Sequence, residues 1–452
     1  MNFSCTEFVS SVSVNTSKAY FNPSDEILPR LHDKSLLDSH DQQKQQPLPT
    51  QPESLRHLAL DAIVANWNGN SIFKSVVLTR QEDRNYILTH LDTQLPLKLL
   101  TEHIRDNYFW RHCCQQRWKP HHHTNSLSQA QPWISIYMQR HLQDYIECVE
   151  TCDYEQEQAQ VVLDICAPYV NRLEITRLQP ATDGRNDHIP LDFILSNLPE
   201  LQMLRLTYAT KTVGSNFCLG SNTMSKKDIT TLSRGLSECH ELVTFCLHST
   251  KLESYQLPLL AYALDIGRHK LTSLSIIHCT MRDAGIKEFV SVCNKESFGT
   301  LVLLDLTDNR ITSEGAYILS RTIRGHSLRK LILRMNPIES DGAAAIFSLM
   351  YVIPVEMIDI SGCSICSSIT KLFMKLIVTN KSLISIDVSN NDVGEEFAKQ
   401  LCKVIGFNKV LQHLDLRNTG ISLERRIKIK DILKLNQMKD KTLLKKILAA
   451  KA

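Results

Sequence analysis

The chain has 452 residues, of which 43% are hydrophobic and 22% charged, values typical of a soluble protein with a substantial buried core. Its formal net charge of +3 is too small over this length to indicate a nucleic-acid binder by itself. The first twenty residues lack the pattern of a secretion signal, and no apolar run approaches eighteen residues, so the fourteen cysteines are expected to be reduced thiols in a reducing compartment.

Two different segments precede residue 165. Residues 1–50 are expected to be disordered, because the stretch 41–52 is rich in Gln and Pro and offers little apolar surface for burial. Residues 55–160 predict a mostly helical N-terminal module. Four apolar residues share one helical face: Leu55, Leu58, Ala62 and Ala65. Three tryptophans supply bulky core material: Trp110, Trp118 and Trp133.

A repeat with a fixed period occupies residues 165–422. Its unit is apolar-x-x-apolar-x-apolar-x-x-Asn-x-apolar, and the clearest copy has Leu301, Leu304, Leu306, Asn309 and Ile311. From Leu242 onward the unit starts are 29, 30, 27, 27, 28 and 28 residues apart. The pattern predicts an α/β leucine-rich-repeat solenoid of the long, ribonuclease-inhibitor-like class. Parallel strands should line its concave face and helices its convex face.

The helical half of each unit shows apolar residues at helical spacing. Ala316, Leu319 and Ile323 form one such face. Further faces are Ile286, Phe289, Val290 and Cys293, and Phe397, Leu401 and Val404. Glycines near each helix start are expected to permit a tight turn: Gly285, Gly315, Gly342 and Gly394.

One unit is too long. The distance from Leu201 to Leu242 is 41 residues, and the excess includes Thr212–Lys227, a stretch rich in Gly, Ser and Asn. This segment is either a tolerated surface loop or a contact loop at the rim of the solenoid, and the sequence does not decide between them. In the second case Asn216 and Phe217 are candidate contact residues.

Motifs for catalysis or cofactor binding are not found, so we expect a protein that is not an enzyme and holds no cofactor or metal. Adjacent Cys113 and Cys114 lack the spacing that zinc requires, and His121–His123 follow a proline as a solvated loop. Cys363 and Cys366 form C-x-x-C. However, Cys363 occupies the Asn position of its repeat, so core packing is favoured over redox chemistry.

Four aspartates share one register, between the two inward apolar residues of the strand: Asp305, Asp359, Asp387 and Asp415. They predict an acidic stripe on the concave face, interrupted by Ile332, which we interpret as an interaction surface rather than an acid–base site. Arg334 and Arg417, in the flanking column, are expected to pair with the stripe and neutralise part of it.

Residues 423–452 predict a basic C-terminal helix or tail, since from residue 421 onward ten Lys or Arg stand against three acids. The first half is expected to cap the last repeat. The second half, with Lys445 and Lys446, is a candidate contact with an acidic surface such as tubulin or another acidic protein. Nucleic acid is a less favoured partner, and a membrane is not expected.

The block Asn107–Trp118 (NYFWRHCCQQRW) resembles the N-terminal module of the T-complex-associated testis-expressed protein family, the leucine-rich-repeat subunit of the nexin–dynein regulatory complex. Gln131–Trp133, Arg140–Leu142 and the stretch Leu206–Phe217 are similar to the same family. The resemblance covers roughly residues 55–420 and leaves both ends unmatched. It implies a non-catalytic scaffold in the axoneme of cilia and flagella that links outer doublets, regulates dynein and binds other subunits of that complex.

Two alternatives remain. The long repeats also resemble those of the Ran GTPase-activating protein, although that family lacks a Trp/Cys module like the one here. A ribonuclease-inhibitor-like or immune-sensor protein ranks below it, since such proteins show more regular Leu/Cys repeats or an attached nucleotide-binding domain.

Overall fold

The computed structural model describes residues 54–69, 80–118, 131–181, 187–208, 223–266, 270–292, 299–325 and 327–451, with side chains undescribed at 292, 325 and 438–451. The chain forms two compact units, Met1–Ile104 and Arg105–Ala452. Their boundary falls inside the segment for which the sequence predicts one helical module. The predictions for residues 1–50, Asn216 and Phe217 lie outside the described residues.

In the first unit, the described helices are α2 (Leu55–Ala65), α4 (Gln81–His90) and α5 (Leu97–His103). The predicted helix α2 exists, but the expected apolar face was wrong. Leu55 and Leu58 are 85% and 51% exposed, and it is Leu60 that is buried. The spacing of apolar residues did not identify the buried side of α2, because Leu60 is the buried residue of this helix.

The second unit begins with α6 (Asn107–Arg117), α8 (Trp133–Cys148), α9 (Gln156–Cys166) and the short 3₁₀ helix η1 (Ala167–Tyr169). The Asp106 side chain caps α6 by accepting from the backbone N–H of Tyr108 and Phe109. Trp110 is fully buried, as expected, whereas Trp118 and Trp133 are only half-buried. One of the three tryptophans is therefore core material.

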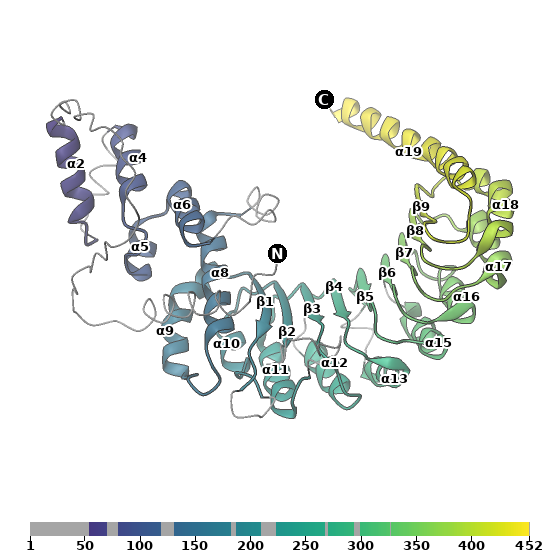
Figure 1. Cartoon of the computed structure of the whole chain (residues 1–452), viewed down its shortest axis with the longest axis horizontal. Coiled ribbons are helices and arrows are strands. Elements are labelled where there is room, and N and C mark those ends of the chain that lie inside the picture. Colours follow the sequence, from purple (N-terminus) through teal and green to yellow (C-terminus); the bar gives the residue numbers. More distant parts are fainter. Residues whose placement is uncertain are drawn as a thin grey trace, which may run out of the picture. The chain divides into compact units, whose positions relative to one another are not determined.

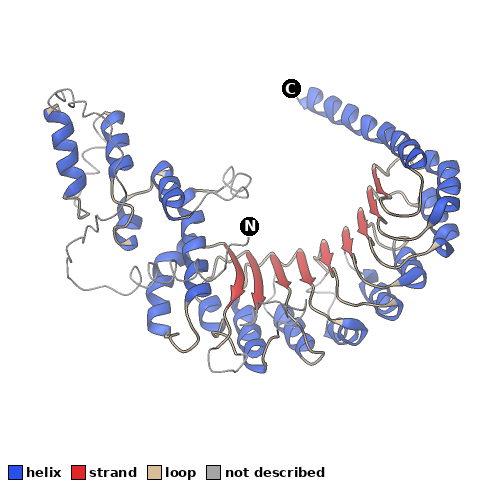
Figure 2. Ribbon diagram, in the orientation of Figure 1, coloured by secondary structure: helices blue, strands red, loops and turns tan. Residues whose placement is uncertain are grey.

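In the described part of the second unit, nine parallel strands follow, paired in chain order in a single sheet. They are β1 (Arg172–Leu178), β2 (Met203–Tyr208), β3 (Thr244–His248), β4 (Ser273–Ile277), β5 (Leu303–Asp305), β6 (Lys330–Ile332), β7 (Met357–Asp359), β8 (Ser385–Asp387) and β9 (His413–Asp415). Figures 1 and 2 show these strands along the inner side of the second unit and the helices along its outer side. The predicted α/β leucine-rich-repeat solenoid is confirmed.

The outer helices are α10 (Asp192–Ser196), α11 (Lys226–Glu238), α12 (Gln256–Ile266), α13 (Arg282–Val292), α15 (Ser313–Thr322), α16 (Glu339–Leu349), α17 (Thr370–Thr379) and α18 (Gly394–Val404). Short 3₁₀ turns are η2 (Ile323–Gly325), η3 (Ser367–Ile369) and η4 (Ile405–Phe407). The predicted apolar faces pack inward, for example Leu319 of α15 and Leu401 of α18. Helix α11 begins at Lys226, so the end of the expected loop Thr212–Lys227 is a helix start instead.

The Asn of the repeat ties neighbouring units together. The amide oxygen of Asn336 accepts from the backbone N–H of Asn309 and Ile311, at 2.8 and 3.0 Å. Its amide nitrogen donates to the carbonyls of Leu306 and Leu333, both at 2.8 Å. Because the side chain is fully buried, these four bonds have no solvent substitute.

Asn309 and Asn391 repeat this arrangement, each bonding backbone groups of its own and the preceding repeat. In Cys363, which takes the Asn position of its repeat, the thiol donates to the Leu333 carbonyl at 3.2 Å. The thiol is completely buried, so the expected packing role of Cys363 is confirmed.

The expected role of the glycines holds at only one helix start. Gly394 begins α18 with φ +78°, a conformation that side chains with a Cβ rarely adopt. Gly342 lies inside the first turn of α16, where a Cβ would stand 3.1 Å from the Ala316 side chain of α15. Glycine there allows close helix packing rather than a turn, and Gly285 and Gly315 lie inside helices in the same way.

Helix α19 (Leu423–Lys451) ends the described chain. Ile429 and Leu433 are buried, and the Asn436 amide donates to the carbonyls of Asn408 and Leu411 at 3.1 and 2.8 Å. The first half of α19 thus covers the last repeat. Among the described residues, no helix is both long enough and apolar enough to cross a membrane.

The Asn bridge predicts a graded stability series. Asn336→Leu leaves the N–H groups of Asn309 and Ile311 buried without an acceptor and should lower the free energy of unfolding by about 2 to 3 kcal/mol, whereas the Leu306 and Leu333 carbonyls keep other donors. Asn336→Cys should lower the free energy of unfolding by about half as much. A thiol can take part in this bonding, as Cys363 does at the same position of its own repeat. Urea unfolding of both variants and of the exposed control Ser348→Ala measures this. Equal losses for Leu and Cys would contradict the assigned role.

Candidate interaction surface

The strand register brings the predicted acidic residues into one column. Asp305 pairs with Ile332, Ile332 with Asp359, Asp359 with Asp387 and Asp387 with Asp415, each on the neighbouring parallel strand. Parallel strands lie about 4.8 Å apart, so the last three carboxylates form a continuous row on the concave face. The predicted stripe and its interruption at Ile332 are confirmed as geometry, and its role in binding stays a prediction.

Each of these carboxylates is engaged locally. The Asp387 carboxylate accepts from the backbone N–H of Ser389 at 2.9 Å. At Asp359 the acceptor oxygen takes both the N–H and the hydroxyl of Ser361, at 2.9 and 2.6 Å. This bond to the residue two positions on helps the chain turn as it leaves the strand. The aspartates therefore have a structural reason to recur, in addition to any binding role.

The two flanking arginines differ. The Arg417 guanidinium pairs with the Asp415 carboxylate at 2.6 Å, as expected. Partial burial opposes ionisation of Asp415, but the hydrogen bonds from Arg417 outweigh it and lower the pKa of that carboxyl. Arg334 is exposed, and within the described part of the chain no ion pair joins it to the stripe. The expected neutralisation is thus limited to the β9 end.

The conspicuous Cys-Cys-x-x-Arg-Trp block lies at the contact between α6 and α8. Cys113 and Cys114 are buried, and burial raises the pKa of each thiol to about 12, so neither is a reactive thiolate. The Arg117 guanidinium bonds the Tyr137 hydroxyl at 3.2 Å and the ring nitrogen of His141. The block therefore holds the two helices together.

Asp144 completes this contact from α8. Its carboxylate accepts from the Trp118 indole at 2.8 Å and lies 3.5 Å from Arg117. The Arg117 guanidinium also stacks 4.8 Å from the centre of the Trp118 ring. Burial and then the charge of Arg117 lower the pKa of His141 to about 3, which keeps this imidazole neutral.

Helix α8 in turn covers the open edge of the sheet. Its Glu147 carboxylate accepts from the backbone N–H and the hydroxyl of Thr176 on β1, at 2.6 and 2.9 Å. Gln139 of α8 donates to the Asn171 side chain, just before β1, at 3.0 Å. Helices α6 and α8 therefore form an N-terminal cap of the solenoid. They cover the edge of β1, where unpaired backbone groups would otherwise be exposed.

A buried His–Asp pair that joins the over-long repeat to the unit before it is absent from the sequence-based predictions. The Asp228 carboxylate bonds the His188 ring nitrogen at 2.9 Å, the His188 backbone N–H at 2.9 Å and the Ser225 N–H at 2.8 Å. Burial opposes ionisation of Asp228, but the bonds from His188 lower its pKa. Ser225 and Asp228 form a capping box, and this Ser-x-x-Asp spacing was the available signal.

This pair is structural rather than catalytic. Both side chains are 1% exposed, so no substrate reaches them. The Tyr208 ring stands edge-on to His188, with ring centres 5.0 Å apart. His188 lies before α10 in the first repeat and Asp228 at the start of α11 in the over-long repeat, so the pair joins these two repeats.

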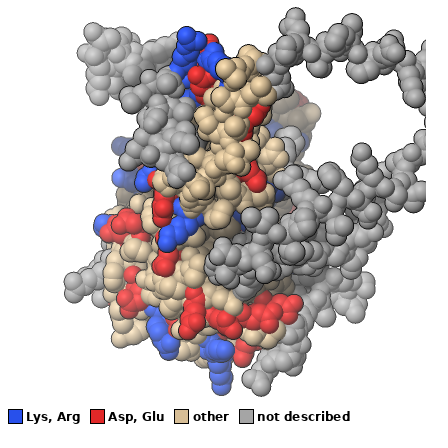
Figure 3. Space-filling view, turned by 90° about the vertical axis from the view of Figure 1, so that its left-hand side faces the viewer, with Lys and Arg blue, Asp and Glu red and all other residues tan. Residues whose placement is uncertain are grey.

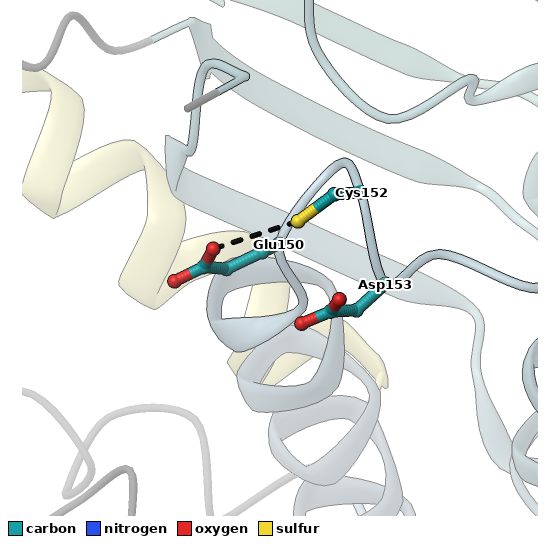
Figure 4. A group of neighbouring side chains, drawn as sticks. All are labelled: Glu150, Cys152 and Asp153. Carbon is teal, nitrogen blue, oxygen red and sulfur yellow. Dashed lines mark hydrogen bonds between the residues drawn. The ribbon is translucent and has the colours of Figure 1, made fainter. Parts of the chain in front are cut away.

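Two further groups of side chains have residue types that can bind a metal or take part in redox chemistry. Glu150, Cys152 and Asp153 lie in the turn after α8, and the Cys152 thiol donates to Glu150 at 3.7 Å (Figure 4). All three are exposed, and nothing else among the described residues points to an ion there.

Cys366 is exposed, contrary to the expected packing, and hydrogen bonds from Ser340 and Ser368 lower its pKa to about 7. Its C-x-x-C neighbour Cys363 is buried, so the two do not form a redox pair on one surface.

Charge elsewhere is mixed. On the face drawn in Figure 3, the described Lys and Arg stand beside Asp and Glu rather than in a broad area of one sign. Lys445 and Lys446 lie in α19, whose side chains from 438 onward are not described. Their predicted contact stays a prediction.

The stripe permits a direct test of its structural role. Asp387→Ala should lower the free energy of unfolding by about 1 kcal/mol, because the Ser389 N–H loses its acceptor. Asp387→Asn keeps an acceptor oxygen and should change stability by less than about 0.5 kcal/mol. Chemical unfolding compares the two. If Asn destabilised as much as Ala, the negative charge and not the hydrogen bond would be the stabilising feature.

The buried His141 of the N-terminal cap predicts that the fold is less stable in acid. The unfolded chain protonates His141 near pH 6.5, whereas the folded chain does so only near pH 3, so the free energy of unfolding falls as pH drops below 6.5. His141→Gln keeps an acceptor for Arg117 without titrating, and should remove up to about 1.4 kcal/mol of this loss per pH unit. Unfolding between pH 7 and 4 measures it, with exposed His240→Gln as the control. An unchanged slope in His141→Gln would contradict the prediction.

The comparisons with known proteins agree with this architecture. A family model described as leucine-rich repeat matches residues 300–320 and 326–347. Dynein regulatory complex subunit 5 of Mus musculus is 25% identical over 254 residues, 52% of this chain and 50% of the relative. The protein of the same name from Chlamydomonas reinhardtii is 24% identical over 202 residues, 44% of this chain and 48% of its own length.

Among solved structures, the actin-binding site 2 of leiomodin-1 overlaps 31% of this chain and 83% of its own, with a TM-score of 0.28 and 16% identity. An overlap this small supports no argument about function. The chain spans about half the length of the curated relatives it matches. The repeats and the solenoid are those of a leucine-rich-repeat protein, and over about half of its length the chain is similar to the leucine-rich-repeat subunit of the dynein regulatory complex.

Proposed function

We propose that this chain is a non-catalytic scaffold subunit of a nexin–dynein regulatory complex, which links outer doublets of the axoneme and regulates dynein-driven beating. The observation that carries the proposal is that four curated relatives, from mammals to Chlamydomonas reinhardtii, share the name dynein regulatory complex subunit 5. The proposal places the protein in the cytoskeleton of motile cilia and flagella.

The chemistry of the described residues supports a scaffold. The groups that could resemble catalytic residues have structural tasks: the His188–Asp228 pair is buried, and the concave aspartates bond the backbone. The alternative of GTPase activation gains no support, since none of the four relatives carries the name of a GTPase activator. Binding to partners is therefore the activity to be tested.

Three surfaces are proposed as contacts with other subunits or with tubulin. The first is the concave stripe with Arg334, of which the row Asp359, Asp387 and Asp415 is the continuous part. The second is the over-long segment with Asn216 and Phe217. The third is the basic end of α19 with Lys445 and Lys446, whose charge suits an acidic microtubule surface.

The proposal predicts the behaviour of the tagged full chain in a motile-ciliated cell that lacks its own copy. The chain should remain with detergent-extracted axonemes at a salt concentration that removes dynein arms, and deletion of the gene should leave cilia of normal length that beat irregularly. A chain ending at Met438 keeps the described cap contacts and should be released at lower salt if the tail binds tubulin. Immunoblots of the fractions and high-speed video measure both. Recovery of the full chain in the cytosolic fraction would refute the proposal.

A further inference from the structure

Helix α12 exposes more large apolar residues than any other described outer helix, and α17, with Leu372 and Val378, comes next. Four are exposed on α12 or directly before it: Tyr255 at 49%, Leu259 at 44%, Tyr262 at 57% and Ile266 at 49%. Their spacing of four, three and four residues places them on one face of the helix. Since the inner face is also apolar, with Leu257, Leu260 and Leu264 buried, α12 is apolar on both sides. A helix of this kind is normally covered on both sides.

The neighbouring helices show that this is not a general feature of the convex side. Exposed Lys227 and Arg234 occupy the outer side of α11, and exposed Lys287 and Glu288 that of α13. On α15, Tyr317 is exposed alone, and the Arg321 guanidinium lies 5.8 Å from its ring centre. The continuous apolar stripe therefore belongs to α12.

Charged residues lie at both ends of the stripe. At its first end the Lys226 ammonium lies 5.9 Å from the centre of the Tyr255 ring, and exposed Lys227 follows it. At the other end of α11 stands exposed Glu238, and beyond it the Glu241 carboxylate, which pairs with Lys270 at 2.9 Å. The Tyr255 end of the stripe thus has two exposed lysines of α11 beside it, and nearby Glu253 is paired with Lys251 at 2.9 Å. Such lysines can orient a partner that carries acidic residues.

The shape of the surface restricts what can cover it. The stripe is one helix wide and, at 1.5 Å per residue, about 16 Å long from Tyr255 to Ile266. Helix α12 lies among the helices on the outer, convex side of the solenoid (Figure 1), and two convex surfaces meet only along a line. A second copy of this chain would therefore bury little beyond the stripe itself, less than stable dimers require. A single helix lying along α12 can also reach the lysines beside it.

We propose that α12 is a docking site for an amphipathic helix of a partner protein, at least three turns long. The apolar face of the partner helix covers Tyr255, Leu259, Tyr262 and Ile266, and its acidic residues lie at the Tyr255 end, against Lys226 and Lys227. This is helix-on-helix recognition through anchors at spacings of three and four residues. The two aromatic anchors near the centre and the end contribute most of the contact. The site does not depend on which assembly the chain belongs to.

Site-specific photo-crosslinking in the cells that express the full chain tests the proposal. Benzoylphenylalanine replaces Tyr262 in one variant and Tyr317, 53% exposed, in the matched control. The adduct yield at position 262 should exceed that at 317 by about fivefold, and the crosslinked peptide should show an apolar helical repeat with flanking acids. Adding Lys226→Glu and Lys227→Glu should reduce the yield about fivefold, as expected for two exposed ion pairs, while Lys→Arg at both positions preserves it.

Three outcomes would overturn the proposal: equal yields at 262 and 317, an adduct to a second copy of this chain, or a crosslinked peptide without the apolar repeat and acids. Thermal unfolding of the variants checks that these surface changes leave the fold intact. The result is separable from the scaffold role. A chain that stays with axonemes but gives no adduct at 262 refutes only the docking site, and an adduct from a chain outside axonemes refutes only the scaffold.

Discussion

The buried Asn amide that joins successive repeats is the interaction on which the solenoid depends. Parallel strands of only three residues, such as β5 to β9, offer few sheet hydrogen bonds of their own. The chain turns sharply after each strand, which buries backbone N–H and carbonyl groups that the sheet does not pair. Asn336 satisfies four of them with one side chain. Three of the four belong to the preceding repeat, so the hydrogen bonds that satisfy the turn also hold neighbouring repeats together.

A solenoid built in this way is incomplete at both ends, and the ends are where this chain departs from generic repeat chemistry. At the first strand, Glu147 from α8 supplies the acceptor that a preceding repeat would have supplied. At the last repeat, Asn436 from α19 donates to carbonyls as the next Asn would have done. The Cys-Cys-x-x-Arg-Trp block contributes to the first of these caps, whereas the units between the caps follow the general leucine-rich-repeat pattern.

The features that could be predicted from the sequence are those that the spacing of residues along the chain determines. The period of 27 to 30 residues fixed the strands, the inner helix faces and the register of Asp359, Asp387 and Asp415, because each is set by spacing. It failed where the requirement comes from a neighbour in space. Whether Leu58 or Leu60 of α2 is buried depends on what packs against that helix, and Gly342 is small because of Ala316 on another helix. The pairing of His188 with Asp228, forty residues apart, leaves no periodic trace.

The concave and convex sides of the solenoid differ in whether the fold itself explains their conspicuous residues. The aspartate column on the concave side looks like a site but has a sufficient local cause, since each described carboxylate supports the turn that follows its strand. The stripe on α12 attracts less attention in the sequence, because apolar residues in a repeat helix are expected to be core. Half-exposed Tyr262 shows no such local cause, and on α13 the exposed positions are occupied by Lys287 and Glu288 instead of aromatic residues. A feature that the fold explains is weak evidence for a partner, and a feature that the fold does not need is stronger evidence. By that criterion the convex side carries the better-supported contact.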